Sequence, residues 1–322
     1  KMDCKMKITP LIIMALALAS CKITTSSIAF YNVENLYDTI DQEHDDQEFL
    51  PEGKNQWSKE RYLTKLDRIN QVLDSMGRMS IVGLGEIENR QVVEELVAKS
   101  ATRQHFKTVH YDSPDLRGVD VAMIYNPKDL TLLQDGYIRF NIENPSTPYT
   151  RDILWAKFNN KKDTVFAMVN HWPSRRGGQE ASEVNRLIAA NAAVKFIDSV
   201  KSASPSSTIV FMGDLNDYPQ DKAPKMIAER LEPMITKSSG KFGGSYNYQN
   251  EWDVLDHIMV SKNVKNPAKN FIILPNSGEI FSRDFIMDEY KGQIVPKRNY
   301  AGSKYLDGYS DHLPVHIKVW LR

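Results

Sequence analysis

The chain ends in the stretch YSDHLPVHIKVWLR (residues 309–322), in which a short polar segment precedes a predicted strand. From Leu313 onward apolar and polar residues alternate, as is typical of a strand with one buried face. Ser310, Asp311 and His312 precede this strand, although a strand requires none of them. Three polar groups at the start of an apolar strand indicate a site at this edge of the fold.

The same arrangement recurs at other apolar runs, which end in residues capable of chemistry. Asn32 and Glu34 follow IAFY, Glu86 follows IVGLG, His171 follows FAMVN, and Asp214 and Asn216 follow IVFMG. Any one of these residues is more simply explained as a turn cap or a structural histidine. Because α/β folds place their sites where strands end, the collection as a whole predicts one common site.

Segments with strand and helix periodicity are interleaved along the chain. Helical spacing of apolar residues predicts helices over 58–76, 91–100 and 181–202, the first with Ser58 as its N-cap. No internal repeat or linker divides the 322 residues. We therefore expect an α/β (α+β) fold of one domain, a four-layer α/β/β/α sandwich in which two mixed β-sheets pack together between helices.

The overall charge is balanced, because 41 lysines and arginines face 41 aspartates and glutamates. No general field attracts the protein to nucleic acid or to an acidic membrane, so polyanion binding would require a local patch. Residues 38–55, DTIDQEHDDQEFLPEGKN, are acidic and irregular. We interpret them as a solvated surface loop rather than a Ca²⁺ loop, because they lack the EF-hand spacing and glycine placement.

The N-terminal residues predict export. Basic residues precede the apolar run LIIMALALA, which is too short to cross a bilayer but suits a signal peptide over residues 1–20. The run ends in LASC, which resembles the lipobox of bacterial lipoproteins, with Cys21 as the lipidated residue. An ordinary signal peptide with a chance cysteine is the alternative. We expect a tether over 21–27, a domain over 28–322 and a lipid anchor in the bacterial cell envelope.

Six motifs in chain order, NVEN, GEIEN, NHWPSR, GDLND, LDHIMVS and SDHLPV, together resemble those of the endonuclease/exonuclease/phosphatase superfamily, the DNase I-like metal-dependent hydrolases. The resemblance runs from Ile28 to the C-terminus, and GDLND and SDHLPV are its most specific parts. It implies the DNase I-like four-layer sandwich and hydrolysis of phosphate esters. It also implies Mg²⁺ or Mn²⁺, since the collected side chains offer carboxylates without cysteine.

The resemblance assigns roles to the residues that match these motifs. Glu86 would be the principal metal ligand, with Glu34 and Asp311 near it, and Asn32 would help to place the ion or a phosphate oxygen. Cleavage of a phosphate ester also requires an activated water and neutralisation of the phosphoryl oxygens. The residues assigned to those tasks are Asp214 for the water, Asn216 and His312 for the phosphate, Asp256 as the partner that keeps His312 protonated, and His171 on the leaving-group side.

Basic residues near these motifs leave two readings open. Arg175 and Arg176, in SRRGGQEAS, form either a phosphate-binding loop or a solvated basic turn, and Arg151 and Arg186 could extend such a patch. His257 should face away from its neighbour Asp256 in an alternating strand, and we interpret it as structural. We favour a structural role for Asp120 as well.

The expected activity is that of an endonuclease-like phosphodiesterase acting on a phosphate-ester substrate, with nucleic acid as one candidate. A phosphomonoesterase or sugar-phosphate phosphatase with the same site is the alternative, and a non-catalytic surface binding protein is the rival from another class. No long apolar hairpin of the kind used to enter a bilayer is present, which ranks phospholipid cleavage lower. We expect a monomer that contacts the membrane only through its anchor.

Overall fold

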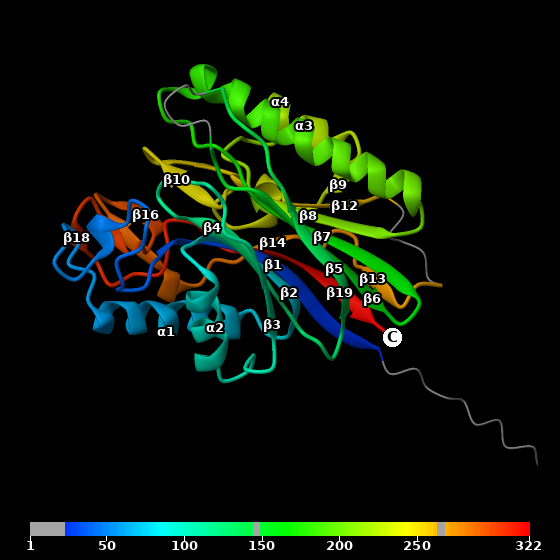
Figure 1. Cartoon of the computed structure of the whole chain (residues 1–322), viewed down its shortest axis with the longest axis horizontal. Helices are drawn as coiled ribbons and strands as arrows, with labels where there is room; N and C mark the ends of the chain where they lie inside the picture. The colour runs from blue at the N-terminus through cyan, green and yellow to red at the C-terminus, as the bar shows by residue number, and fades with distance from the viewer. Residues whose placement is uncertain (1–22, 144–148, 263–267) are drawn as a thin grey trace, which may run out of the picture.

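The computed structural model describes residues 23–143, 149–262 and 268–322, which form a four-layer sandwich (Figure 1). Helices α1 (Lys59–Ser75) and α2 (Arg90–Lys99) lie on one side of two stacked sheets, and α3 (Gln179–Ala203) and α4 (Lys222–Ala228) lie on the other. The predicted α/β/β/α architecture is confirmed. The N-cap of α1 is Ser58, as predicted, and its hydroxyl accepts the N–H of Arg61 at 3.3 Å.

The first sheet contains both ends of the described chain. Its order is β13 (Phe271–Ile273), β19 (Val315–Leu321), β1 (Thr24–Leu36), β2 (Met79–Ile87), β4 (Asp120–Tyr125) and β3 (Lys107–His110), with β14 (Glu279–Ile280) also paired to β19. Strand β1 runs parallel to β2 and antiparallel to β19. The C-terminal strand therefore lies directly beside the first one.

The second sheet is also mixed. Its order is β5 (Thr131–Ile138), β6 (Ile153–Asn160), β7 (Asp163–His171), β8 (Thr208–Asp214), β12 (Asp256–Ser261) and β9 (Leu231–Pro233). Strands β7 and β8 are parallel, whereas β8 and β12 are antiparallel. Three short hairpins complete the fold, formed by β10 (Tyr246–Tyr248) with β11 (Glu251–Asp253), β15 (Met287–Tyr290) with β16 (Gln293–Pro296), and β17 (Tyr300–Ala301) with β18 (Lys304–Tyr305).

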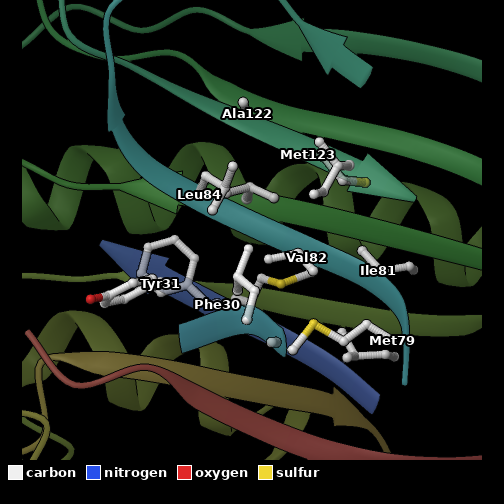
Figure 2. Close-up of a cluster of buried hydrophobic side chains, with 14 of the residues drawn as sticks. Phe30, Tyr31, Met79, Ile81, Val82, Leu84, Ala122 and Met123 are labelled. Carbon is white, nitrogen blue, oxygen red and sulfur yellow. The ribbon is translucent and has the colours of Figure 1, made fainter. Parts of the chain in front are cut away.

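The two sheets meet in an apolar core (Figure 2). Phe30, from β1, is fully buried and lies beside side chains of β2 in this cluster. At Gly83 the sheets come so close that an added Cβ would lie 3.0 Å from both Met212 Sδ and Val169 Cγ2. A glycine in the middle of β2 therefore marks close sheet contact rather than a weak strand.

Strand β1 begins at Thr24, earlier than the predicted start of the domain at residue 28. Thr24 pairs with Leu321, and Ser26 accepts a hydrogen bond from the Ser80 hydroxyl at 2.8 Å. The predicted tether over 21–27 is thus too long, because polar residues at its end are held in the sheet by backbone pairing and a buried hydroxyl contact. The predicted signal peptide and Cys21 lie outside the described residues. Within the described part of the chain, no helix is long and apolar enough to cross a membrane.

Candidate active site

Strand register brings three predicted residues together in the second sheet. His171 is the register partner of Asp214 across the parallel β7–β8 pair, and Asp256 is the register partner of Asp214 across the antiparallel β8–β12 pair. Residues directly opposite one another project from the same face of a sheet. His171, Asp214 and Asp256 therefore stand in a row where these strands end.

The first sheet adds two residues to this row. Asn32, in β1 just before its register shift, donates from Nδ2 to Asp214 Oδ2 at 3.1 Å. His312, just before β19, lies with Nδ1 2.8 Å from Asp256 Oδ2 and with Nε2 3.8 Å from Asp214 Oδ2. The predicted contact between Asp256 and His312 is confirmed. The site consequently forms at the edge that the two sheets share. We refer below to its five residues, Asn32, His171, Asp214, Asp256 and His312, as the row.

The glycine of the GDLND motif permits this convergence. At Gly213, an added Cβ would lie 2.2 Å from the carbonyl oxygen of Asn170. No other residue fits between β7 and β8 at this point without moving backbone. Gly213 thus allows Asp214 to lie close to His171, whose Nε2 is 3.6 Å from Asp214 Oδ2.

The two histidines of the site have opposite protonation preferences. Burial alone would lower the pKa of His312, but the charges of Asp256 and Asp214 raise its pKa well above the usual value. Burial and the nearby positive charges of Arg151, Arg117 and His312 lower the pKa of His171 well below its usual value. Near neutral pH, His312 is therefore an imidazolium and His171 a neutral imidazole. Two titratable groups pushed apart in this way are typical of acid–base sites.

Asp214, between them, is fully enclosed. Burial raises its pKa to about 7, although the charge of His312 opposes this shift. Its Oδ1 accepts the backbone N–H of Asn216 at 2.9 Å, and its Oδ2 faces Asn32 and both imidazoles. The carboxylate is thus held in one orientation by neighbours from both sheets, and it titrates in a range suited to exchanging a proton with water.

Unusual backbone conformations accompany the site. Glu34, Glu86 and Asn216 adopt positive φ values of 54°, 61° and 49°. The β1–β2 pairing shifts register between Asn32 and Leu36, and the β2–β4 pairing shifts after Gly85. Left-handed conformations of non-glycine residues are uncommon and cluster at functional sites. These bulges redirect the carboxylates of Glu34 and Glu86 away from the regular alternation of their strands.

The three carboxylates predicted to share a metal have different surroundings. Glu86 accepts the N–H of Asn35 at 2.9 Å through Oε2, while its Oε1 accepts no hydrogen bond from any described residue. Asp311 pairs with Arg298 at 3.1 Å. Among the described residues, Glu34, Glu86 and Asp311 are not part of a group whose ligand atoms all lie within 4.8 Å of one another. The charge of Asp311 acts on Glu34, and all three carboxylates act on Lys65, so the three share one region without forming a set this compact.

Glu34 differs most from its prediction as a metal ligand. Its Oε2 accepts the N–H of Asn299 at 2.6 Å, and its Oε1 accepts the N–H of Tyr300 at 3.3 Å and faces Arg298 Nε at 3.5 Å. Burial, together with the charge of Asp311, raises the pKa of Glu34 to about 7. Both oxygens are occupied, so the structure assigns Glu34 to holding the loop at residues 298–300.

Two cations beside these carboxylates were not predicted. Lys65, from α1, is buried and donates to the Tyr309 carbonyl at 2.6 Å, and burial lowers its pKa to about 8. Lys65 follows Tyr62 by three residues and precedes Ile69 by four, so it lies on the apolar face of α1. A lysine on that face is the signal that could have indicated its burial. Arg298 gives no such signal in its sequence surroundings.

The two arginines of the predicted phosphate-binding loop have different surroundings in the structure. Arg175 donates to the carbonyl of Asn216 at 2.8 Å, pairs with Asp221 at 2.8 Å and stacks over Tyr218 at 3.7 Å. Arg175 was predicted to bind substrate, but in this structure its guanidinium is neutralised and oriented by these partners inside the fold. Arg176 is exposed, and no described residue forms a hydrogen bond or ion pair with it.

Asn216 also has an internal partner. Its Nδ2 donates to the carbonyl of Trp172 at 3.0 Å, which commits one of the two amide hydrogens that were expected to serve a phosphate. The contact joins the loop after β8 to the residue that follows His171. Asn216 therefore supports the site in this structure, and its second amide hydrogen remains for a ligand.

The remaining arginines proposed for a basic patch are structural. Arg151 donates to the carbonyls of His171 at 3.2 Å and Trp172 at 2.7 Å, and Arg186 is completely buried beside Asp217 at 2.7 Å. His257 contacts the carbonyl of Asp217 at 2.9 Å, which confirms that it faces away from Asp256. These contacts fix the backbone next to the site from inside the fold.

The donor chemistry of the site fits a divalent cation. Ligand atoms of Asp214, Asp256 and His312 lie within 4.8 Å of one another, and Oδ1 of Asp256 is buried without a hydrogen-bond partner. Glu86, in β2 of the first sheet, offers a further free oxygen, Oε1, outside that group. Carboxylate oxygens of this kind suit Mg²⁺ and Mn²⁺. The acidic and histidine residues here could therefore bind a metal ion.

A four-layer sandwich with paired aspartates and histidines at the edge shared by its sheets defines a phosphoesterase-type hydrolase. The family model described as "Endonuclease/Exonuclease/phosphatase family" matches residues 27–320, and the chain belongs to this family. No curated protein matches the sequence.

Solved structures with the same fold share little sequence with the chain. An endonuclease/exonuclease/phosphatase family protein of Bacteroides thetaiotaomicron has a TM-score of 0.58 at 14% identity, covering 94% of this chain and 96% of that one. The catalytic domain of human Nocturnin with bound sulfate has a TM-score of 0.57 at 14% identity, with coverages of 94% and 97%. A mannosyl-6-phosphatase of Bacteroides thetaiotaomicron has a TM-score of 0.57 at 14% identity, with coverages of 91% and 99%.

Proposed function

We propose that the protein is a divalent-metal-dependent phosphodiesterase of the endonuclease-like type. The observation that carries the proposal is the position of Asp214, whose Oδ2 faces neutral His171 at 3.6 Å and charged His312 at 3.8 Å while Asn32 orients it at 3.1 Å. One carboxylate between a proton donor and a neutral base is an arrangement suited to attack by water on a phosphate.

Each residue of the row has a task in this reaction. His312, charged through Asp256, donates a hydrogen bond to a phosphoryl oxygen and stabilises the charge that develops there. Asp214 orients the attacking water and accepts its proton. His171 stands on the leaving-group side. A bound Mg²⁺ or Mn²⁺, held by Glu86 with Asp311 and Asn32 nearby, would neutralise phosphoryl charge as a Lewis acid.

The small number of charged donors left for the substrate favours a diester. A phosphodiester carries a single negative charge, whereas a phosphomonoester approaches two near neutral pH. Arg151, Arg175 and Arg186, the arginines considered for a basic patch, all pair with carboxylates inside the fold. The charged imidazole in the row is that of His312, and its Nε2 forms no hydrogen bond with any described residue, so it offers the substrate a single donor, which suits a monoanion.

Arg117 supports a second candidate, a phosphomonoesterase or sugar-phosphate phosphatase. Its side chain is 49% exposed, and it pairs with Asp115 at a distance of 3.6 Å. Its positive charge also interacts electrostatically with Glu86 and His171. A guanidinium in this position could balance the second charge of a monoester. The mannosyl-6-phosphatase that shares the fold belongs to this class by its name.

A substrate panel separates the candidates. Plasmid DNA, a bis-aryl phosphodiester and a phosphomonoester would be compared with added Mg²⁺, Mn²⁺ or chelator. We expect metal-dependent cleavage of diesters that is lost in Asp214→Ala and His312→Ala but kept in His105→Ala, a histidine outside the row. Full activity in both site variants would refute the mechanism, and turnover of the monoester alone would establish the second candidate. No turnover of any substrate would point to a non-catalytic binding protein.

We further propose that the protein acts as a monomer at the bacterial cell envelope, anchored by a lipid on Cys21. The support is the LASC sequence after an apolar run, together with the absence of other cysteines beyond Cys4. Expression in bacteria with a labelled fatty acid tests the anchor. Label and detergent partitioning should be present in the wild type and absent in Cys21→Ser, and equal labelling of the two would refute it.

A further inference from the structure

A second cluster of metal-type ligands lies outside the row of site residues. Its members are His44 and Asp46, from the acidic segment 38–55, and Glu88, just after β2. His44 Nε2 lies 3.3 Å from Glu88 Oε1 and 3.8 Å from Asp46 Oδ2. The side chains of Asp46 and Glu88 are only 2% and 1% exposed, whereas that of His44 is 24% exposed. The acidic segment thus carries part of a buried cluster instead of being uniformly solvated.

The cluster contains an unsatisfied buried oxygen. Asp46 Oδ2 accepts the N–H of Gln42 at 3.1 Å, but Asp46 Oδ1 is sealed from solvent without any hydrogen-bond partner. Glu88 Oε2 accepts the N–H of Asp38 at 2.6 Å, which leaves its Oε1 facing His44. In the described ranges, no lysine or arginine forms an ion pair with Asp46 or Glu88.

This arrangement is costly without a cation. A buried carboxylate oxygen that lacks a donor loses its hydration without compensation, and two neighbouring carboxylates repel each other. A hydrogen bond between His44 and Glu88 would account for one oxygen of Glu88, but it leaves Asp46 Oδ1 without a partner. A bound ion would satisfy all three side chains at once.

We propose that His44, Asp46 and Glu88 bind a divalent transition-metal ion, with Zn²⁺ as the best fit. An imidazole nitrogen with two carboxylates is a donor set for Zn²⁺ or Mn²⁺ rather than for Ca²⁺ or Mg²⁺, which prefer oxygen alone. Ligands at Zn²⁺ bond lengths in a tetrahedron are separated by about 3.3 Å. The distances of 3.3 Å and 3.8 Å from His44 Nε2 are near this value. Water on the exposed side of His44 would complete the shell.

The ion would brace loops that border the catalytic row. The ring of His44 lies against Gly118, where an added Cβ would meet it at 2.2 Å, and Asp45 donates to the carbonyl of Leu116 at 2.9 Å. Arg117 lies between these two residues, and Glu88 follows Glu86 by two positions. The site would thus join three segments that surround Glu86. It is a structural site, independent of the reaction proposed above.

Zinc binding to the full chain tests the proposal. Protein freed of metal by chelator is titrated with Zn²⁺ by calorimetry, and thermal unfolding is measured with and without the ion. We compare the wild type with His44→Ala and Asp46→Asn, with His312→Ala to disable the catalytic row, and with His105→Ala as the matched histidine control. We expect His44→Ala and Asp46→Asn to lose one molar equivalent of Zn²⁺ and the associated rise in Tm, while His105→Ala keeps both.

The outcomes separate this site from the catalytic one. Persistence of the Zn²⁺-dependent rise in Tm in His312→Ala would support a separate site even if the proposed activity fails. Equal Zn²⁺ stoichiometry in the wild type, His44→Ala and Asp46→Asn would overturn the proposal. Preferential binding of Ca²⁺ or Mg²⁺ that depends on the same residues would overturn the assignment of metal class. If His44→Ala does not fold, Asp46→Asn decides, because it preserves shape and removes only the charge.

Discussion

The Nδ1 atom of His312 lies 2.8 Å from Oδ2 of Asp256, although 56 positions separate the two residues in the chain. Asp256 begins β12 of the second sheet, and His312 precedes β19 of the first. This contact joins the sheets at the candidate active site. It also sets the charge of the imidazole, because the two neighbouring aspartates outweigh the effect of burial and raise the pKa of His312.

The first prediction concerns pH. Because the pKa of His312 is raised, its imidazolium is present below that pKa, and activity that requires it is lost as pH rises through it. Asp256→Asn removes one stabilising charge and lowers the pKa. The loss of kcat/KM on the alkaline side should move to lower pH, and kcat should fall about 100-fold. A pH–rate profile measures both effects.

Asp120→Asn is the matched control for this experiment. Asp120 Oδ2 faces His110 Nε2 at 3.3 Å in another buried pair that lies outside the row. Its replacement should leave the position of the pH profile unchanged. An identical profile for the wild type and Asp256→Asn would contradict the role assigned to the pair.

The second prediction concerns metal. Chelation should abolish activity, and Mg²⁺ or Mn²⁺ should restore it. Glu86→Gln should raise the metal concentration needed for half-maximal activity at least about tenfold, because a ligand oxygen with formal charge is lost. The surface variant Glu94→Gln, with a side chain 59% exposed, should match the wild type. A metal requirement unchanged in Glu86→Gln would show that another residue is the principal ligand.

The third prediction concerns the support behind His171. Arg151→Met removes donors to two carbonyls and leaves the buried Asp115 with only its longer pair to Arg117 at 3.6 Å. The free energy of unfolding should fall by about 3–5 kcal/mol, as for other broken buried pairs. Arg139→Met breaks a pair with Asp152 in which the arginine is 47% exposed, and it should cost less than about 1 kcal/mol. Urea denaturation compares the two, and similar losses would argue against a bracing role for Arg151.

The fourth prediction separates the substrate classes. If the protein hydrolyses monoesters, Arg117→Ala should raise KM for a phosphomonoester roughly tenfold, as expected when a charge-assisted hydrogen bond is lost. The KM for a phosphodiester should change much less. Arg176→Ala tests the remaining predicted substrate-binding arginine in the same assay, and Arg283→Ala, which pairs with Glu279, is the distant control. Equal effects of Arg117→Ala and Arg283→Ala would exclude Arg117 from substrate binding.

Periodicity and strand ends were sufficient to predict much of this molecule. Alternation in the apolar runs placed the strands, helical spacing placed α1, and the polar residues after each run marked the edge where the site forms. The pairing of Asp256 with His312 followed from the motif resemblance. These features are local, because which face of a strand is apolar and where the strand ends depend on neighbouring residues.

The tertiary structure alone decided how the charges are paired. Arg175 resembled a phosphate ligand until folding placed Asp217 and Asp221 beside it, and Glu34 resembled a metal ligand until the backbone of residues 299–300 occupied it from 265 positions away. Lys65 likewise reaches Tyr309 across 244 positions. A charged side chain at a strand end can bind a ligand or pair with another group of the protein. Which of these it does depends on the distant residues that folding places next to it. The sequence by itself determined where polar groups gather, whereas three-dimensional packing decided which of them remain free to act.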